Sequence, residues 1–296
     1  FKPIGKIDFS EKSVYDTGQF FLHKKFGYRG IILKNWVTKF TNKDESLKSS
    51  LDHPNEIQVY QVLADKRDLI ECESYLKSGL TFLHNYDKYS GVLHHISGVD
   101  YAFHEDILPL DIDSHEGIEN PYMNEFFQNS DGQFLPKENL GAWLEEKQSF
   151  LSSQNVSQNV SNGVKVTAIT FFMGRKSIKT EEEEKLSRLW RYLIRIEYFG
   201  EERIQLRERF WKIFSIDGSI ESLTGAGVVG KEPLFTKNNR IFQYHSHVQV
   251  NVPWAHVWGT YRFDRDDGTA FDVRIPAFPI CDKTEEQAKD EDFDSS

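Results

Sequence analysis

Apolar and polar residues alternate along several short stretches in the second half of the chain. The clearest is 191–198, RYLIRIEY, in which every second residue is apolar and the others are mostly charged. A period of two is typical of a half-buried antiparallel strand. We expect further strands at 164–172, 205–216, 247–252, 257–265 and 270–275. Asp-Gly pairs at 217–218 and 267–268 mark two hairpin turns. The pattern therefore predicts an immunoglobulin- or fibronectin-like antiparallel β-sandwich over 164–281.

Shorter strand patterns fill the first third of the chain. They lie at 17–23, 30–33, 58–63 and 91–96. The stretch 38–55 is polar and irregular, and we expect an insertion loop there. Strands this short, with turns this close together, are typical of a compact barrel rather than of a parallel sheet. We therefore expect a small β-barrel domain over 14–118.

The hydrophobic period changes to that of a helix between the two β regions. An apolar stripe over 122–127 predicts one short helix, and a second stripe over 140–144, after Pro136, predicts another. We expect these two helices to bridge the domains over 119–151. The stretch 152–163 is rich in Ser, Asn and Gln and repeats QNVS, which is typical of a linker.

Charge and cysteine content narrow the classes of function. The 296 residues carry a net charge of −10, and the segment 282–296 holds seven acidic residues and two lysines, which is half of that charge. We expect this tail to be disordered. The acidic balance argues against non-specific nucleic-acid binding. Cys72 and Cys281 are far apart, which disfavours a disulfide framework and a structural zinc site and favours an intracellular compartment.

Gly225, Gly227 and Gly230 spell GxGxxG, the pattern of a dinucleotide-binding turn. That motif requires a helix directly after the glycines, so that the helix amino terminus can hold the pyrophosphate. Here Pro233 follows closely, and a proline cannot lie inside a normal helix. We expect the glycines to shape a loop between antiparallel strands. A ligand-binding role, in which the loop cradles a nucleotide or pyrophosphate, stays open as the alternative.

Arg207, Arg209 and Trp211 share one face of a predicted strand, because alternate residues of a strand point to the same side. An exposed face of arginine and tryptophan suits anionic or protein partners, so these three are candidate partner-binding residues. The simpler interpretation is a solvated sheet face, paired with nearby glutamates such as Glu208.

Phe26, Tyr28 and Arg29 lie in a tight turn, FGYRG, between two predicted strands. Two aromatic side chains and an arginine at such a turn are candidate partner-binding residues at an exposed tip. A barrel corner packed by its own aromatics is an equally good interpretation of the same residues.

No arrangement of residues stands out as catalytic or metal-binding. His245 and His247 would share one strand face, with His256 nearby, but zinc needs three or four ligands and a further cysteine or carboxylate is not evident. Ordinary strand histidines are the simpler interpretation. The sequence lacks GxSxG, a Walker A lysine and HExxH. We therefore predict no metal site, no catalytic residues and no enzymatic activity.

Two parts of the chain resemble known domain families. The segment 23–33, HKKFGYRGIIL, together with YQVL at 60–63, resembles the bacterial HspQ/YccV-type domain. That resemblance implies an SH3-like barrel, linked to hemimethylated-DNA binding and to the control of proteolysis. The region 164–280 resembles an ApaG (DUF525) domain, through QLRERFWKI at 205–213 and GAGVVGKEP at 225–233. It implies a fibronectin-like sandwich without established catalysis.

The two domains in this order resemble the polymerase delta-interacting protein 2 family, as do GVDY at 98–101, HEDILP at 104–109 and FDVRIP at 271–276. His245 and the long acidic tail depart from the family. The resemblance implies a non-enzymatic adaptor without a cofactor. Its implied partners are the small subunit of DNA polymerase delta, the sliding clamp, primase-polymerase and the ClpX unfoldase, with DNA a weaker one. It also implies a mitochondrial matrix location, after removal of a transit peptide, and a nuclear one.

Overall fold

The structure is a computed structural model, and it describes residues 5–9, 12–42, 56–76, 80–85, 91–112, 117–153, 155–179 and 184–282. Two compact units make up the chain. The described residues of the first unit fall within Phe1–Lys39, Leu51–Leu80 and His95–Ser152. Those of the second fall within Phe40–Ser50, Thr81–His94 and Ser153–Ser296. Both units are built mainly of antiparallel strands, as the sequence predicts.

The main sheet of the first unit is antiparallel throughout. Its strands, in pairing order, are β1 (Lys6–Ile7), β8 (Ile107–Asp111), β2 (Phe20–His23), β3 (Arg29–Asn42), β4 (Glu56–Ala64) and β7 (Val99–Phe103). Among these strands no described pairing joins β1 to β7, so backbone hydrogen bonds do not close the ladder. Phe21, Tyr28 and Tyr60 are fully buried in this unit, and they place its core on the inner face of the sheet.

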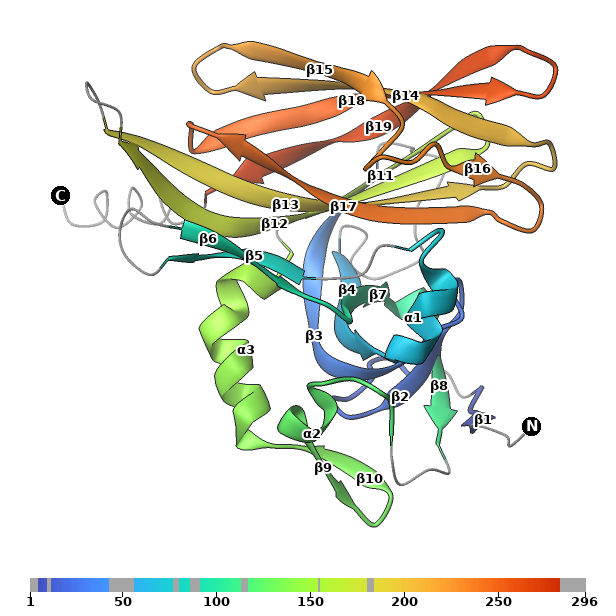
Figure 1. Ribbon diagram of the computed structural model, residues 1–296, viewed down its shortest axis with the longest axis vertical. Helices are drawn as coiled ribbons and strands as arrows, with labels where there is room; N and C mark the ends of the chain where they lie inside the picture. The colour runs from blue at the N-terminus through green and yellow to red at the C-terminus, as the bar shows by residue number, and fades with distance from the viewer. Residues whose placement is uncertain are drawn as a thin grey trace. The chain divides into compact units, whose positions relative to one another are not determined.

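Helices and a hairpin complete the first unit (Figure 1). They are α1 (Lys66–Cys72), η1 (His104–Asp106), α2 (Met123–Phe126), β9 (Phe127–Ser130), β10 (Gln133–Pro136) and α3 (Glu138–Leu151). Strands β5 (Leu80–Asn85) and β6 (Gly91–Ile96) form a separate two-stranded sheet, most of which falls within the second unit. The two expected helices exist as α2 and α3, but both belong to the first unit. The first of them is shorter than expected, because Phe127 already begins a strand.

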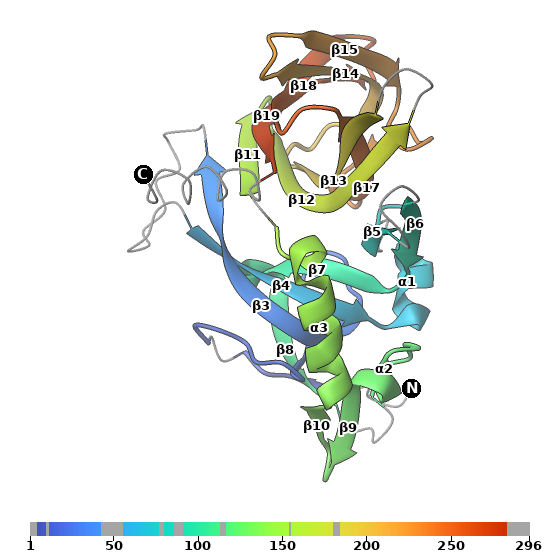
Figure 2. The same ribbon diagram turned by 90° about the vertical axis from the view of Figure 1, so that its left-hand side faces the viewer.

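The second unit is a sandwich of two sheets, which Figure 2 shows as facing layers. One sheet has the order β11 (Asn155–Ser161), β12 (Val164–Lys179), β13 (Glu184–Tyr198) and β17 (Ile241–Val250). The other has the order β15 (Ile220–Ala226), β14 (Ile204–Ser215), β18 (Trp254–Arg265) and β19 (Ala270–Cys281), with β16 (Leu234–Phe235) also beside β14. The last residues of β3, from Phe40, pair in parallel with β11.

Large aromatic side chains fill the space between these two sheets. The hydroxyl groups of Tyr244 and Tyr261, one from each sheet, are 2.5 Å apart. The ring of Tyr192 lies 5.6 Å from that of Trp211. Phe278 packs 6.0 Å from Trp211, between ring centroids. The inward side of each alternating strand therefore supplies the core, as a period of two requires.

Both Asp-Gly hairpins are confirmed. Gly218 and Gly268 have positive φ values of 86° and 82°, which a glycine adopts without steric cost. In each turn the aspartate carboxylate accepts hydrogen bonds from the amide and hydroxyl of the residue two positions later. These bonds lower the pKa of Asp217 and Asp267.

Three expectations need correction. The stretch 152–163 is not an irregular linker, because its residues 155–161 form β11 and pair with β12 along their whole length. The expected insertion loop starts later than residue 38, because β3 continues to Asn42, and the residues 43–55 lie outside the described part. Asp282 is a buried, ion-paired residue rather than the start of the tail, and 283–296 lie outside the described residues.

Candidate functional site

The glycine loop, residues 225–230, follows β15 and turns back toward β14. The amide of Gly227 donates to the carbonyl oxygen of Arg207 at 2.7 Å. The amides of Val228 and Lys231 each donate to the other residue's carbonyl oxygen, at 2.8 and 2.9 Å. Backbone carbonyl groups therefore occupy three amides that an anion cradle would use.

Gly227 is required by this turn rather than by a ligand. Its φ is +54°, and a Cβ at this position would lie 2.1 Å from the carbonyl oxygen of Lys231. Gly230 has φ +75° and open space around it. No helix follows the glycines, as expected, and the loop connects β15 to β16, which both pair antiparallel with β14.

The three residues predicted to share an exposed strand face do not do so. The ladder between β14 and β18 shifts register between Leu206 and Glu208, and this bulge takes Arg207 out of the alternation. Arg207 pairs with Glu232 at 2.6 Å and with Asp264 at 3.0 Å. The three residues therefore share no exposed face, and the ion-pair partners of Arg207 are Glu232 and Asp264 rather than the expected glutamates such as Glu208.

Arg209 and Trp211 point between the sheets instead. Trp211 is only 6% exposed. Arg209 donates from Nη1 to the carbonyl oxygens of Ala226 and Gly227, at 2.8 and 2.7 Å. Its guanidinium group lies against Gly225, where a Cβ would come within 2.8 Å of Nη2. Arg209 thus ties the glycine loop to β14, and Gly225 provides the room for it.

Arg209, Trp211 and the glycine loop meet at a cavity of about 310 Å³ between the sheets. Its other walls come from strands β13, β15, β17 and β18, through Tyr192, Tyr244, Ser246, His247, Leu223, Thr224 and Val257. Burial raises the pKa of Tyr192, and it raises the pKa of Tyr244 well above its ordinary value. Both hydroxyl groups are therefore neutral at physiological pH. The walls of this inter-sheet cavity combine aromatic and aliphatic side chains with the polar Thr224, Ser246 and His247 and with the cationic Arg209.

The turn that contains Phe26, Tyr28 and Arg29 is a packed corner rather than an exposed tip. Phe26 and Tyr28 are buried, and the Tyr28 hydroxyl donates to Asp100 Oδ2 at 2.9 Å. Arg29 donates from Nε and Nη2 to both carboxylate oxygens of Asp68, at 2.7 and 2.8 Å. The turn is therefore not an exposed tip, and the alternative of a corner packed by its own aromatic side chains agrees with the structure.

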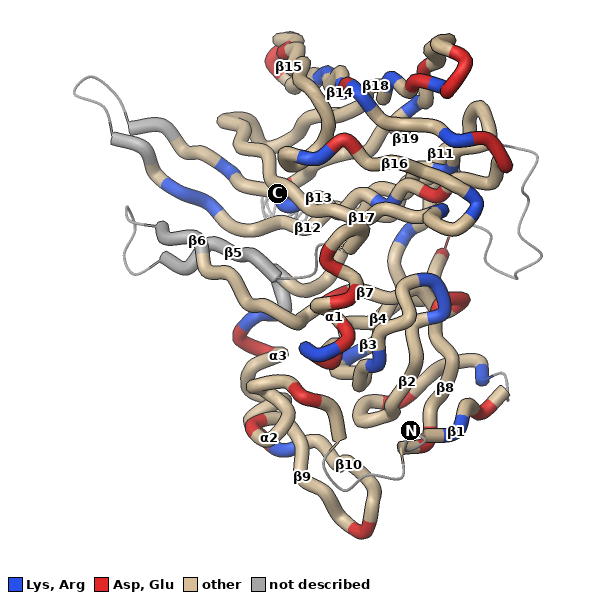
Figure 3. The backbone as a smooth tube through the Cα atoms, turned by 45° about the vertical axis from the view of Figure 1, so that its right-hand side comes forward, with Lys and Arg blue, Asp and Glu red and all other residues tan. Residues whose placement is uncertain are grey.

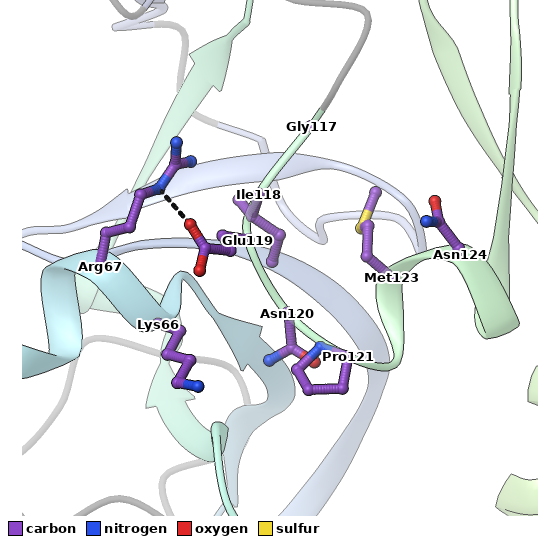
Figure 4. Close-up of a pocket in the computed structure, with 9 residues that line it drawn as sticks. All are labelled: Lys66, Arg67, Gly117, Ile118, Glu119, Asn120, Pro121, Met123 and Asn124. Atoms are coloured by element: carbon purple, nitrogen blue, oxygen red, sulfur yellow. Dashed lines mark ion pairs between the residues drawn. The ribbon is translucent and has the colours of Figure 1, made fainter.

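A pocket of about 400 Å³ lies beside this corner, within the first unit. Figure 4 shows Arg67 extended toward Glu119, with 3.7 Å between Nε and Oε2. Asp65 caps α1 by accepting from the Arg67 amide. Burial of the Asp65 carboxyl group opposes its ionisation, but hydrogen bonds from Arg67 and the charge of Arg29 outweigh this effect and lower the pKa of Asp65. No sequence motif marked this pocket, because its walls come from segments about 50 residues apart.

The candidate histidines do not gather into a metal site. His245 and His247 lie on β17, while His256 lies on β18 with its ring 5.1 Å from that of Trp254. Among the described residues, no three histidine, cysteine or acidic side chains are placed to hold a metal ion. In the same part of the chain, none of the helices has the length and apolar composition of a membrane span.

Comparisons with known proteins match both units. Residues 13–134 match the family described as "Hemimethylated DNA-binding protein YccV like", and residues 179–265 match the ApaG domain. The first match extends past residue 118, where we expected the first domain to end, and takes in α2 and the β9–β10 hairpin.

The relatives cover one or both of these domains. Protein ApaG of Xanthobacter autotrophicus is 32% identical over 121 residues, which are 41% of this chain and 89% of that protein. A solved structure, Northeast Structural Genomics Consortium target SoR45, is 28% identical with a TM-score of 0.37, and covers 42% of this chain and 89% of that one. Polymerase delta-interacting protein 2 of Homo sapiens is 38% identical over 289 residues, which are 92% of this chain and 77% of that protein. The chain belongs to the polymerase delta-interacting protein 2 family.

Proposed function

We propose that this chain is a non-enzymatic adaptor that binds other proteins. The observation that carries the proposal is the 38% identity, across both domains, to a protein whose name states that it interacts with a polymerase. An adaptor also needs an accessible surface with apolar anchors, and the second unit provides one.

That surface is the outward side of the β14–β15–β18 sheet. Trp254 and Trp258 alternate along β18 with the buried residues Ala255 and Val257, so both tryptophans face away from the core. On the neighbouring strands, Phe210 is 37% exposed and Ile220 is 61% exposed. We call these four outward residues, with Phe214, the aromatic face; its members are Phe210, Phe214, Ile220, Trp254 and Trp258.

The register of the strands brings these side chains together. Phe214 lies opposite Ile220 on β15, and Phe210 lies four residues before Phe214, on the same side of β14. Lys212 lies between them, opposite Trp258 of β18. β15 is also the end strand of its sheet, and an end strand can pair with a strand from a partner. Aromatic anchors beside an available strand edge are typical of a protein-binding surface.

In this proposal the partners are replication and proteolysis factors. They are the small subunit of DNA polymerase delta, the sliding clamp, primase-polymerase and the ClpX unfoldase. The adaptor modulates DNA synthesis and mitochondrial proteolysis, and it acts in the mitochondrial matrix and in the nucleus. The support for these partners and places is the family resemblance of the sequence.

Two other functions have weaker support. DNA binding is favoured by the description of the family that matches residues 13–134. Basic and acidic positions are interspersed over both units in Figure 3, however, whereas non-specific DNA binding uses a clustered basic surface. A nucleotide or pyrophosphate sensor would use the glycine-loop amides, and the amides of Gly227 and Val228 already donate to backbone carbonyl groups.

Hydrogen–deuterium exchange of the purified chain, with and without the purified small subunit of DNA polymerase delta, tests the adaptor proposal. We expect slower exchange in peptides that cover 220–226 and 254–258, because partner pairing along β15 and cover of the aromatic face both protect these amides. Protection confined to the first unit would overturn the assignment of the surface. Absence of binding to each of the four proposed partners would overturn the adaptor function.

A further inference from the structure

The inter-sheet cavity has the construction of a small-molecule site. Its volume of about 310 Å³ lies at the lower end of the range for ligand pockets. It lies inside the second unit, where β15 and β17, the end strands of their sheets, both contribute to its walls. Leu223 lies opposite the buried Trp211 on the inner side of the sheet, yet it is 52% exposed. The cavity therefore opens to solvent beside Leu223.

The aromatic part of the walls favours a flat, mostly apolar ligand, while Thr224, Ser246 and His247 add polar groups. Tyr192, Trp211 and Tyr244 present aromatic rings to the cavity, and their hydroxyl groups, where present, are already engaged. Tyr244 bonds to Tyr261 across the core, and Tyr192 bonds to Ser246. A ligand held here gains mainly from burial of apolar surface and from ring packing.

One cation stands on the wall without an acidic partner. Within the described part of the chain, Arg207 of the same strand forms ion pairs with two carboxylates, whereas Arg209 has none within 4.0 Å. Its two hydrogen bonds, both from Nη1, go to backbone carbonyl groups, which hold the guanidinium group in place without neutralising its charge. A fixed guanidinium group beside an apolar cavity suits a carboxylate, since the two can form charge-assisted hydrogen bonds.

We propose that this cavity binds a small aromatic carboxylate, with its ring system among Tyr192, Trp211 and Tyr244 and its carboxylate on Arg209. A single guanidinium group suits a monoanion, whereas a pyrophosphate carries several charges, and Arg209 is the one arginine or lysine among the residues that line the cavity. The Val228–Val229 side of the glycine loop lies over the ligand, so the glycine motif shapes this site without using its amides as the anion cradle.

Isothermal titration calorimetry on the full chain tests the proposal with three probes: 2-naphthoate, the neutral 2-naphthamide and inorganic pyrophosphate. We expect 2-naphthoate to bind at one site, and 2-naphthamide to bind at least tenfold more weakly, because it lacks the charge. Pyrophosphate should not compete. No binding of 2-naphthoate at millimolar concentration, equal affinity for the amide, or displacement by pyrophosphate would each overturn the assignment.

Variants locate the site. Arg209→Met should weaken 2-naphthoate at least tenfold and leave 2-naphthamide unchanged. Arg207→Met is the matched control, because Arg207 lies on the same strand but forms its ion pairs outside the cavity, and it should leave both affinities unchanged. Leu223→Trp narrows the opening without touching Arg209 and should abolish binding of both probes. Binding that survives both Arg209→Met and Leu223→Trp would refute the site.

Discussion

The end of β19 is held by a buried carboxylate, and its removal gives a quantitative test of the fold. Asp282 is 1% exposed. Its two oxygens accept from Arg175 Nε and Nη2, at 2.6 and 2.8 Å, and from Arg188 Nε at 3.0 Å. Arg188 is itself buried, with its side chain 6% exposed. Asp282→Asn therefore leaves a guanidinium charge inside the protein beside a neutral amide.

The expected cost follows from this burial. Hydrogen bonds to charged groups contribute about 1.5–3 kcal/mol each and are not additive, and loss of one partner of a buried pair costs about 3–5 kcal/mol. The side chain of Arg175 is about a third exposed, so water can hydrate its guanidinium group in the variant. The expected loss of stability therefore lies near the lower limit of this range. We predict that Asp282→Asn lowers the free energy of unfolding of the second unit by about 3 kcal/mol.

Urea denaturation at neutral pH, followed by tryptophan fluorescence, measures this difference. Asp272→Asn is the matched control on the same strand, because Asp272 is 58% exposed and lies 3.9 Å from its ion-pair partner Arg262. We expect the control to change the free energy of unfolding by less than about 0.5 kcal/mol. Equal effects of the two substitutions would refute the reasoning that Asp282 anchors β19 through buried ion pairs.

Three further predictions follow from positions with an unusual environment. Gly227→Ala should destabilise the protein by at least about 2 kcal/mol, since a Cβ there meets a backbone oxygen at 2.1 Å, whereas Gly230→Ala, in open space, should cost about half as much in the same urea experiment; equal costs would contradict the turn geometry. Asp65→Asn should cost about 2 kcal/mol at pH 7. Because the pKa of Asp65 is lowered in the folded state, its contribution is present above the ordinary value of 3.8 and is lost as the pH falls through the folded value. The difference in the free energy of unfolding between Asp65→Asn and the unmodified protein should therefore be smaller at pH 3 than at pH 7. An equal difference at the two pH values would exclude this linkage. Burial raises the pKa of the Cys72 thiol, so iodoacetamide should alkylate Cys72 at least tenfold more slowly than the partly exposed Cys281, measured by peptide mapping of the native protein; similar rates would contradict the burial.

Local signals in the sequence predicted the parts of the fold that depend on local chemistry. The structure contains the strand predicted over 191–198 and both Asp-Gly turns. The strand is not half-buried, however, because its charged residues Arg191, Arg195 and Glu197 are buried as well. The segment 155–161 was not recognised as a strand, because its only apolar residues, Val156 and Val160, are four residues apart. Backbone pairing on both sides, with β12 and with the end of β3, forms this strand although its sequence has no alternating apolar pattern.

The candidate site depended on contacts that a single sequence does not show. A bulge of one residue between Leu206 and Glu208 separated Arg207 from Arg209, although strict alternation placed them together. The hydroxyl of the buried Tyr28 donates a hydrogen bond to Asp100, 72 residues away. The inter-sheet cavity collects residues from five strands, so it could be found only after those strands were placed. Arg209 and Trp211 were nevertheless predicted as candidate binding residues, because arginine and tryptophan are typical of recognition sites.

The affinity of the purified chain for the purified small subunit of DNA polymerase delta tests the adaptor proposal most directly. The measurement compares the unmodified chain, the double variant Phe210→Ser/Ile220→Ser and the control Ile70→Ser, which changes a similarly exposed apolar residue of α1 in the first unit. We predict that the unmodified chain and the control bind equally well. The double variant, which removes two apolar side chains from the aromatic face, should bind at least about tenfold more weakly. Equal affinity of all three proteins, or no binding by the unmodified chain, would contradict the account.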